Sequence, residues 1–421
     1  MIICLAGKNE IAVNALEFIL KNKPEDATVV GLPNTGDDGV NGWQPSFRFA
    51  CNKLNVRIVT LEECYAIEDL LFLSLEFAKL IQPKKFLSTR LFNLHFSLLP
   101  AYKGSLTSIH PILNGDSHSG VTLHCIDEGI DTGKIIAQRN FTIDESHNSR
   151  NLYASYNQYA LELLKNNFNN LLYNSFTETV QPIVGSSFYS VKSISFASLC
   201  INLQKTAFEI SNQIRAFAFR EYQLPAIEGE AVYKAEFVYE RAIGKPGTIV
   251  SQNEDWFLVN AVDYQIKIFK DRQVALFNAA VVGDIEQIEK IEAAGFDINV
   301  RNNKGWNILL VACFNQQLLS VKYLVKNGFD INATNFKGTT ALMFAKTAAT
   351  RTGNLELLQW MLNNGADPSL KDDVGKTALD YARTDDAEVI VRLLQNFAED
   401  KMDEEASNRQ NILLQHFSIK E

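Results

Sequence analysis

The chain has 421 residues, of which 46% are hydrophobic and 21% charged, a composition typical of folded globular proteins and not of disordered ones. This length exceeds a single ordinary core and predicts several domains. The formal net charge of −9 offers no overall basic field to a polyanion, so the composition argues against a nucleic-acid partner.

The cysteines and the N-terminus bear on the compartment. The six cysteines are widely spaced, with no CxxC pair, which is typical of reduced thiols. The opening MIICLAGKNE lacks a basic segment followed by a long apolar run, and no stretch reaches about 18 consecutive apolar residues. We therefore expect a cytoplasmic protein without a membrane partner.

Strand and helix patterns alternate through the first half of the chain. Apolar strand patterns cover residues 2–7, 27–32, 56–61, 70–75 and 92–96, and amphipathic helix patterns cover residues 9–20, 46–54 and 61–67. This alternation favours a parallel, Rossmann-like α/β sheet, which we assign to a domain over residues 1–185. The pattern GxGxxG is absent, so the sheet need not bind a dinucleotide.

From about residue 187 the pattern changes to short β-like pieces. They cover residues 190–196, 235–240, 247–252, 256–261 and 264–269, with one helical stretch at 205–217. We expect a small β-rich domain over residues 186–272.

A repeat occupies the last third of the chain. Gly305, Gly338 and Gly375 open similar segments at intervals of 33 and 37 residues, and N-G-x-D and G-x-T-x-L-x-x-A patterns recur around them. This period resembles ankyrin repeats and predicts an α-helical array over residues 273–398, with an insertion near residues 347–352. The acidic residues 399–421 are expected to form a linker and a short terminal helix.

Polar chemistry is concentrated between residues 93 and 133. Asn93 and His95 should project to one side of a strand end, and the glycine-bounded DEGIDTG loop at 127–133 could return a carboxylate toward them. A buried core histidine is the simplest alternative. A zinc site is another, although the spacing fits no known metal motif; its ligands would be His95, His110, His118 and His124.

The whole string NLHFSLLPAYKGSLTSIHPILNGDSHSGVTLHCIDEGIDTGKII resembles the hallmark of 10-formyltetrahydrofolate-dependent formyltransferases. The shared features are Asn-x-His-x-Ser-Leu-Leu-Pro, then Gly-Val-Thr, then Asp-x-Gly-x-Asp-x-Gly. The family includes methionyl-tRNA, glycinamide ribonucleotide and nucleotide-sugar enzymes, so the resemblance predicts the reaction better than the acceptor. It implies 10-formyltetrahydrofolate as the formyl donor and no metal.

The resemblance implies a catalytic trio of Asn93, His95 and Asp131. The Asn93 amide would donate to the formyl oxygen as negative charge develops there. His95 would take the proton of the attacking amine, and Asp131 would orient the ring and stabilise the imidazolium. His124 is expected to hold the DEGIDTG loop in place.

The folate, by the same resemblance, lies in a slot beside the trio. The side chains expected nearest the pterin are Ser74, Glu76 and Phe77, and the loop that contains Asp127 and Gly129 should bind its edge.

Three flanking segments resemble the nucleotide-sugar N-formyltransferases: AGKNEIAVNALEFIL, GDDGVNGWQPSF and FREYQLPAI. They imply sugar-binding roles for Lys8, Asn9, Trp43, Arg215 and Tyr222. The acceptor we expect is dTDP-3-amino-3,6-dideoxy-D-glucose, used for O-antigen in lipopolysaccharide, and the enzyme is expected to be a homodimer. The 4-amino isomer, methionyl-tRNA and a non-catalytic ankyrin scaffold are the alternatives.

Trp306 stands out in the array. The position after the turn glycine holds Thr339 and Lys376 in other repeats, where we expect an exposed site. A large aromatic residue there predicts a contact for a second nucleotide-sugar or a protein, with packing on a neighbouring domain as the alternative. Asn307 beside it should cap the following helix.

Overall fold

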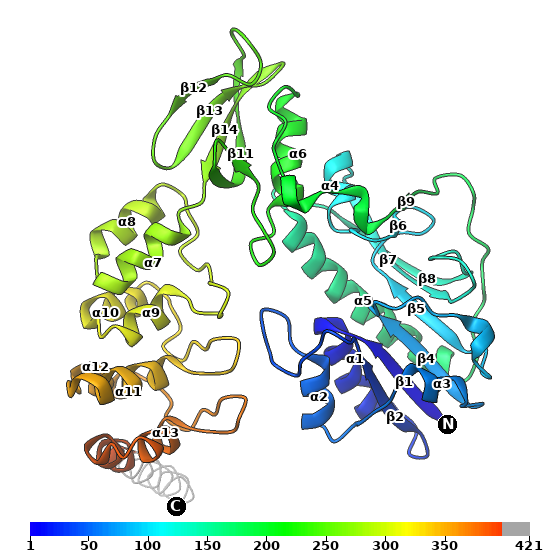
Figure 1. Cartoon of the computed structure of the whole chain (residues 1–421), viewed down its shortest axis with the longest axis horizontal. Coiled ribbons are helices and arrows are strands. Elements are labelled where there is room, and N and C mark those ends of the chain that lie inside the picture. Colours follow the sequence, from blue (N-terminus) through cyan, green and yellow to red (C-terminus); the bar gives the residue numbers. More distant parts are fainter. Residues whose placement is uncertain (398–421) are drawn as a thin grey trace, which may run out of the picture. The chain divides into compact units, whose positions relative to one another are not determined.

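The structure is a computed structural model in which residues 1–397 are described. The chain forms two compact units that divide between Asp271 and Arg272 (Figure 1). Residues 1–271 are called the N-terminal unit here and the residues from Arg272 onward the array. The linker and helix expected over residues 399–421 lie outside the described residues. Among the helices of residues 1–397, none is long and apolar enough to span a bilayer.

A seven-stranded sheet forms the centre of the N-terminal unit, in the order β3-β2-β1-β4-β5-β7-β8 (Figure 1). Its strands are β1 (Ile2–Gly7), β2 (Thr28–Pro33), β3 (Arg57–Ile58), β4 (Leu70–Leu75), β5 (Leu91–His95), β7 (His118–Cys125) and β8 (Ile135–Thr142). The strands from β3 to β5 are parallel, as predicted. β7 pairs antiparallel with β5 and with β8, and the sequence patterns marked neither β7 nor β8 as a strand. The loop 126–134 between β7 and β8 is too short for the crossover that a parallel pair needs.

Both faces of the sheet are buried. Alternate residues of β1 join two separate cores: Ile3 and Leu5 belong to one, and Cys4 and Ala6 to the other. An uninterrupted apolar run such as IICLAG is what a strand covered on both faces requires. The helices of this region are α1 (Asn9–Asn22), α2 (Phe47–Lys53), α3 (Leu61–Tyr65), α4 (His110–Asn114) and α5 (Ser149–Leu172).

The β-rich region completes the N-terminal unit. Its sheet has the order β10-β11-β14-β13-β12. The elements are α6 (Ala207–Phe217), β10 (Ala226–Ile227), β11 (Glu230–Arg241), β12 (Ile249–Gln252), β13 (Trp256–Asn260) and β14 (Tyr264–Lys270). They confirm the predicted helix at 205–217 and the four strand segments after it.

The strand expected over residues 190–196 is wrong. Only β9 (Phe188–Tyr189) forms there, paired with β6 (Lys103–Gly104), and 3-10 turns follow at Val191–Ser193 and Phe196–Ser198. The Ser193 hydroxyl donates to the carbonyl oxygen of Ser190 over 2.7 Å. Such local bonds favour a turn over an extended strand.

The array is helical, as predicted. Its helices are α7 (Gln273–Val282), α8 (Ile285–Ala293), α9 (Ile308–Phe314), α10 (Leu318–Lys326), α11 (Ala341–Thr352), α12 (Glu356–Asn363) and α13 (Ala378–Thr384). Asn307 caps α9 by accepting the N–H of Leu310, which confirms that expectation. The insertion near 347–352 lengthens α11 to 12 residues, against 7 in α9, so it extends a helix and not a loop.

Candidate active site

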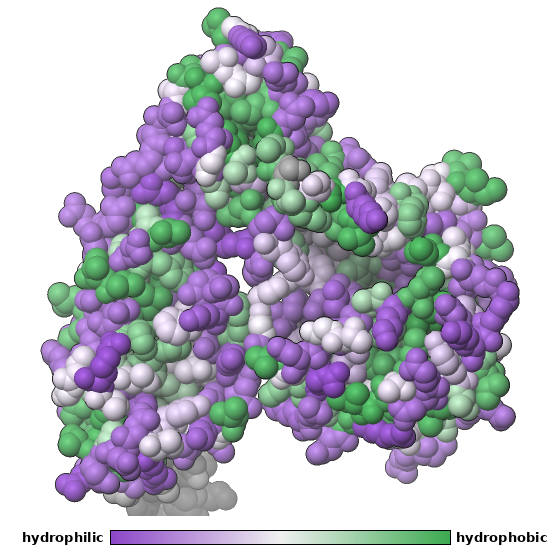
Figure 2. Space-filling model, in the orientation of Figure 1, coloured by the Kyte–Doolittle hydropathy of each residue, from purple (hydrophilic) through white to green (hydrophobic). Residues whose placement is uncertain are grey.

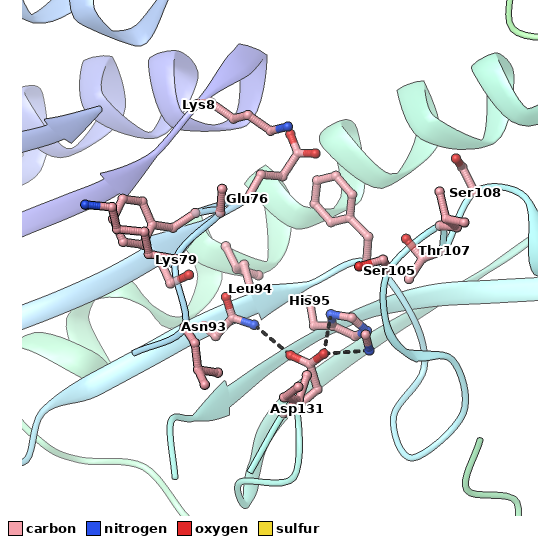
Figure 3. Close-up of a pocket in the computed structure, with 18 of the residues that line it drawn as sticks. Lys8, Glu76, Lys79, Asn93, Leu94, His95, Ser105, Thr107, Ser108 and Asp131 are labelled. Atoms are coloured by element: carbon pink, nitrogen blue, oxygen red, sulfur yellow. Dashed lines mark hydrogen bonds and ion pairs between the residues drawn. The ribbon is translucent and has the colours of Figure 1, made fainter. Parts of the chain in front are cut away.

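Asn93 and His95 lie at the carboxyl end of β5, paired with His124 and Thr122 of β7. Because side chains alternate along a strand, both point to the same face of the sheet. The His95 side chain is buried, whereas Asn93 is partly exposed. Figure 3 shows both side chains directed toward Asp131.

Asp131 comes from the loop between β7 and β8 and joins the two strand residues. Its Oδ1 accepts from Nδ2 of Asn93 over 3.3 Å, and its Oδ2 lies 3.5 Å from Nδ1 of His95. The backbone N–H of Gly104 donates to Oδ2 over 2.8 Å. The structure therefore brings the carboxylate, 38 residues away from Asn93 in the chain, to the amide and the imidazole.

The surroundings set the charge of this group. Burial raises the pKa of Asp131, but the attraction of His95, the nearby His124 ring and the hydrogen bond from Gly104 outweigh it and lower that pKa to about 2. Burial lowers the pKa of His95 below its ordinary value, against the opposing effects of Asp131 and the Tyr102 carbonyl. At neutral pH the carboxylate is therefore ionised and the imidazole is neutral.

The neutral His95 ring is held in one tautomer. Its Nε2 lies 2.8 Å from the backbone carbonyl oxygen of Tyr102. A carbonyl oxygen can only accept a hydrogen bond, so Nε2 carries the proton and Nδ1 has a free lone pair. Nδ1 is therefore the atom able to accept a proton, and the Asp131 carboxylate faces it.

Both hydrogens of the Asn93 amide are in use. One points to Oδ1 of Asp131, and the other to Nε2 of His124, 3.1 Å from Nδ2. Nδ1 of His124 lies 2.8 Å from the carbonyl oxygen of Cys125 and so carries the ring proton, which leaves Nε2 as an acceptor. His124 thus orients the Asn93 amide, in addition to lying 3.6 Å from Oδ1 of Asp131.

A cavity of about 710 Å³ opens beside the trio, and Figure 2 shows a hollow on this face of the N-terminal unit. This volume is in the range of sites for small ligands and cofactors. Among its lining residues are apolar side chains (Leu80, Ile81, Ile126, Ile130), hydroxyl side chains (Ser105, Thr107, Ser108) and the aromatic residues Phe77, Tyr153, Phe196, Phe219 and Tyr222.

The cavity collects most of the residues singled out from sequence. Those lining it are Lys8, Ser74, Glu76, Phe77, Asp127, Gly129 and Tyr222, together with the trio. Asn9 and Trp43 lie behind this lining: Asn9 bonds to Glu76, and the Trp43 ring packs on Phe219 and Tyr222.

Arg215 lies elsewhere. Its guanidinium donates to the backbone carbonyls of His147 over 2.8 Å and Asp144 over 3.0 Å. Arg215 is not among the residues that line the cavity, and its guanidinium holds the loop before α5, so its sugar contact stays a prediction. The arginine looked available because its two carbonyl partners are 68 and 71 residues away in the chain.

Glu76 is held at the opposite end of the lining from Asp131 (Figure 3). Its Oε2 accepts from the Tyr153 hydroxyl over 2.6 Å and from Nδ2 of Asn9 over 3.3 Å. Burial raises the pKa of Glu76, while the bonds from Tyr153 and Asn9 and the nearby Lys8 charge oppose the rise. The carboxylate is thus fixed by two side chains that face it from other elements.

Hydrogen bonds between residues of the 127–133 loop fix its conformation. Oδ1 of Asp127 accepts from the Gly129 N–H over 3.1 Å and from the Thr132 hydroxyl over 2.6 Å. A side chain at Gly133 would put its Cβ 1.7 Å from the Cys125 carbonyl oxygen, so glycine is required where the loop returns to β7. Asp131 itself has φ 53°, a left-handed conformation that is strained for a non-glycine residue.

The four histidines considered as zinc ligands do not converge. His110 stacks on Tyr189 with 3.7 Å between ring centroids, and His118 bonds to Ser117. Within residues 1–397, no group of three or more histidine, cysteine or acidic side chains is arranged to hold a metal ion.

Sequence reasoning missed Tyr153 and the hydroxyls of residues 105–108. Tyr153 lies near the start of α5, 77 residues from its partner Glu76. A tyrosine in an amphipathic helix is expected to be a core residue, so nothing in the local sequence indicated that Tyr153 lines a site. The hydroxyl cluster lay inside the family string but outside its fixed positions.

Trp306 is not the exposed tip that the repeat pattern predicted. It is half-buried, and its ring packs against Phe344 with 4.4 Å between centroids and against Phe314 with 5.4 Å. Lys304 and Arg351 lie over the Trp306 and Phe314 rings. The packing is therefore within the array itself, on the helix of the same repeat and on that of the next one.

Comparisons with known proteins match the N-terminal unit and the array to different families. Residues 69–166 match the family model described as Formyl transferase. Residues 276–348 match a model of three ankyrin repeats, and residues 337–373 match an ankyrin repeat.

Curated relatives of lower identity include methionyl-tRNA formyltransferases. The enzyme from Fervidobacterium nodosum is 27% identical over 234 residues, which are 52% of this chain and 71% of the relative. The enzyme from Staphylococcus aureus is 26% identical over 185 residues, 44% of this chain and 59% of the relative. The chain therefore spans well under the full length of these relatives.

Two solved structures match at higher identity. WlaRD, a sugar 3N-formyl transferase solved in the presence of dTDP and 5-N-formyl-THF, is 46% identical with a TM-score of 0.60, over 64% of this chain and 97% of WlaRD. The N-formyltransferase from Helicobacter canadensis, solved in complex with folinic acid and dTDP-3-aminofucose, is 44% identical with a TM-score of 0.60, over 64% of this chain and all of that one. At this identity over nearly whole relatives, the chain belongs to the sugar N-formyltransferases and is an N-formyltransferase that carries an ankyrin array.

Proposed function

We propose that the chain transfers the formyl group of 10-formyltetrahydrofolate to the amino group of a dTDP-linked amino-dideoxy sugar, with dTDP-3-amino-3,6-dideoxy-D-glucose as the acceptor. The observation that carries the proposal is the convergence of Asn93, His95 and Asp131 on one wall of the cavity. The two relatives at 44–46% identity support the substrate classes, because one was solved with dTDP and a formyl folate and the other with dTDP-3-aminofucose.

The trio suits the chemistry of an amine attacking a formyl carbonyl, which the bound folate supplies. Nδ1 of His95 accepts the proton that the attacking nitrogen loses, and Asp131 stabilises the imidazolium that results. As the bond between the formyl carbon and the folate nitrogen breaks, the imidazolium returns this proton to that nitrogen, which gives tetrahydrofolate and the formamido sugar. The Asn93 amide donates to the carbonyl oxygen as it gains negative charge. Each group acts from a side chain already positioned by the bonds described above.

The donor's place is the part of the cavity formed by Ser74, Glu76, Phe77, Asp127 and Gly129. Apolar side chains at Leu80, Ile81, Ile126 and Ile130 line the same cavity. A flat heterocycle with polar edges fits such a lining, since apolar walls cover its faces and backbone or carboxyl groups meet its edge.

The acceptor's place is the part formed by Lys8 and Tyr222, with Asn9 and Trp43 behind them. Tyr222 is largely exposed at the rim and packs edge-on against Trp43. An exposed ring braced in this way can cover part of a nucleotide-sugar at low conformational cost.

A panel of dTDP-linked 3-amino and 4-amino sugars, each mixed with 10-formyltetrahydrofolate, tests the proposal. We expect tetrahydrofolate release and a formamido product with the 3-amino sugars. Preference for a 4-amino sugar would move the acceptor to the alternative isomer, and formylation of charged initiator tRNA would indicate that class instead. Turnover with none of them, alongside a stoichiometric protein partner in pull-downs, would indicate a non-catalytic scaffold.

We place this activity in the cytoplasm, in O-antigen synthesis for lipopolysaccharide, and in a homodimer. Light scattering of the purified chain measures the assembly. Loss of the formamido sugar from the lipopolysaccharide of cells lacking the gene tests the role, and an unchanged polysaccharide contradicts it.

We also propose that the array binds a second ligand or a partner around Trp306. The half-exposed ring, its aromatic neighbours and the cations of Lys304 and Arg351 support this, because a planar anionic ligand suits such a surface. Trp306→Ala should alter substrate saturation curves or assembly. If both are unchanged while the array stays folded, Trp306 serves packing alone.

A further inference from the structure

The segment that follows α5, residues 175–189, crosses back over the loops that hold the trio. It is attached first to the sheet: Thr179 and Ile135 exchange two backbone hydrogen bonds of 2.8 Å. It then reaches β9, which pairs with β6 at Lys103–Gly104. We call residues 179–189 the clamp.

The clamp contacts the Asp131 loop through one side chain. Nε2 of Gln181 donates to the carbonyl oxygens of Asp131 over 2.9 Å and Gly133 over 2.7 Å. The two carbonyls belong to the left-handed residue Asp131 itself and to Gly133, two residues after it. One amide that bridges both therefore restrains a backbone conformation that would otherwise relax.

The clamp contacts the loop 100–105 through Ser187. Its hydroxyl accepts from the Tyr102 N–H over 2.8 Å, and its carbonyl accepts from the Lys103 N–H over 2.9 Å. The contact is close: a side chain at Gly104 would put its Cβ 2.3 Å from the Tyr189 carbonyl oxygen. Tyr102 is also left-handed, with φ 58°, so the Ser187 hydroxyl again restrains a strained residue.

Residues 102 and 104 are the ones that touch the trio. The Tyr102 carbonyl holds the proton on Nε2 of His95, and the Gly104 N–H donates to Oδ2 of Asp131. A backbone shift at either residue would change the tautomer of the base or the place of its carboxylate. We therefore propose that Ser187 and Gln181 are positioning residues that fix the His95 tautomer and the Asp131 carboxylate through the backbones they hold.

Several apolar side chains of the clamp are exposed, so hydrogen bonds contribute much of what holds the clamp in place. Val180, Ile183 and Val184 are 73%, 92% and 89% exposed. Tyr189 at its end stacks on His110 and on Tyr102. A segment of this kind opens locally at low cost, so removing one hydrogen bond should change how often the trio is correctly arranged.

The test compares Ser187→Ala with the neighbouring Ser186→Ala, whose hydroxyl accepts from the partly exposed Lys103 ammonium over 3.2 Å. Because misplacement of catalytic groups by about 1 Å costs about 10²-fold, we expect kcat of Ser187→Ala to fall by about tenfold or more with little change in KM. Gln181→Ala should behave alike. Ser186→Ala should keep the rate of the parent enzyme, and Ser187→Thr, which keeps a hydroxyl, should recover most of it.

A substrate-free readout separates this inference from the proposed function, on which its kinetic arm rests. Selective ¹⁵N labelling of the six histidines reports the His95 tautomer in the free chain, assigned with a His95→Gln variant. We expect the Nε2–H form in the parent and a mixture in Ser187→Ala. The proposal is overturned if Ser187→Ala leaves both the His95 tautomer and kcat unchanged. It is also overturned if the substitution raises KM and leaves kcat unchanged. If no sugar is turned over, the tautomer shift alone decides it.

Discussion

The Tyr153 hydroxyl donates to Oε2 of Glu76 over 2.6 Å and so ties helix α5 to the end of strand β4. Burial raises the pKa of Glu76, and this bond is the first effect that opposes the rise. Both residues line the cavity, and Figure 3 shows Glu76 away from Asp131. Removing this hydrogen bond should change both the pKa of Glu76 and the stability of the chain.

Tyr153→Phe should raise the pKa of Glu76 further and lower the free energy of unfolding by about 1.5–3 kcal/mol, the usual contribution of a hydrogen bond to a charged group. The loss should grow as pH rises above 4.5, the ordinary pKa of glutamate, because the ionised carboxylate is the form left without its donor. Urea unfolding at several pH values measures it. Tyr159→Phe, on the same helix but stacked on Phe141, is the control and should show no such pH dependence.

His95→Ala should reduce kcat by about 10²–10⁴-fold, the range for loss of a general base. Single-turnover formyl transfer checks this independently of product release. His118→Gln is the matched control, because that ring is exposed at the start of β7 and bonds to Ser117. A His95→Ala enzyme with the parent's single-turnover rate would remove His95 from the mechanism.

The pH dependence of kcat should follow the His95 ring. Since only the neutral ring accepts a proton, kcat falls as pH drops through the pKa of His95, which burial places below 6.5. Asp131→Asn removes the attraction that raises this pKa, so the acid limb of the profile should move to lower pH while kcat decreases. Profiles of the two enzymes across neutral and mildly acidic pH give the comparison. An acid limb above pH 7 in the parent contradicts the assignment.

Lys346 and Asp385, both in the array, form an ion pair of 2.6 Å. The Lys346 side chain is buried, with 3% exposed, whereas 40% of the Asp385 side chain is exposed. Asp385→Ala leaves a buried ammonium unpaired and should cost about 3–5 kcal/mol. Lys346→Met leaves an aspartate that water can reach and should be close to neutral. Calorimetric unfolding of the full chain measures both, and equal losses would show that burial does not govern this pair.

The strands and the trio were predictable for different reasons. LLFLSL and IICLAG are almost entirely apolar runs, which in this alternation with helices indicate strands covered on both faces. Asn93 and His95 are two residues apart, so strand geometry alone places them on one face. Asp131 needed the family string as well, because a loop of nine positions between β7 and β8 does not reveal where its carboxylate points.

Contacts between distant segments were not predictable. From the sequence, Arg215 is a candidate ligand-binding cation, but in the structure its guanidinium donates to the carbonyls of Asp144 and His147. Trp306 was placed at the correct turn by the repeat period, yet the period does not say that Phe344 lies beneath the ring. In both cases the deciding partner comes from another part of the fold, and neither residue's neighbours in sequence record it.

Asn93 begins the reaction with both amide hydrogens committed, to Asp131 and to His124. A neutral formyl oxygen is a poor competitor for a hydrogen bond already made to a carboxylate, whereas an oxygen gaining a full charge is a strong one. The amide would thus discriminate between the resting N-formyl amide carbonyl and its tetrahedral form, so that Asn93 substitutions slow turnover without weakening the binding of the folate donor.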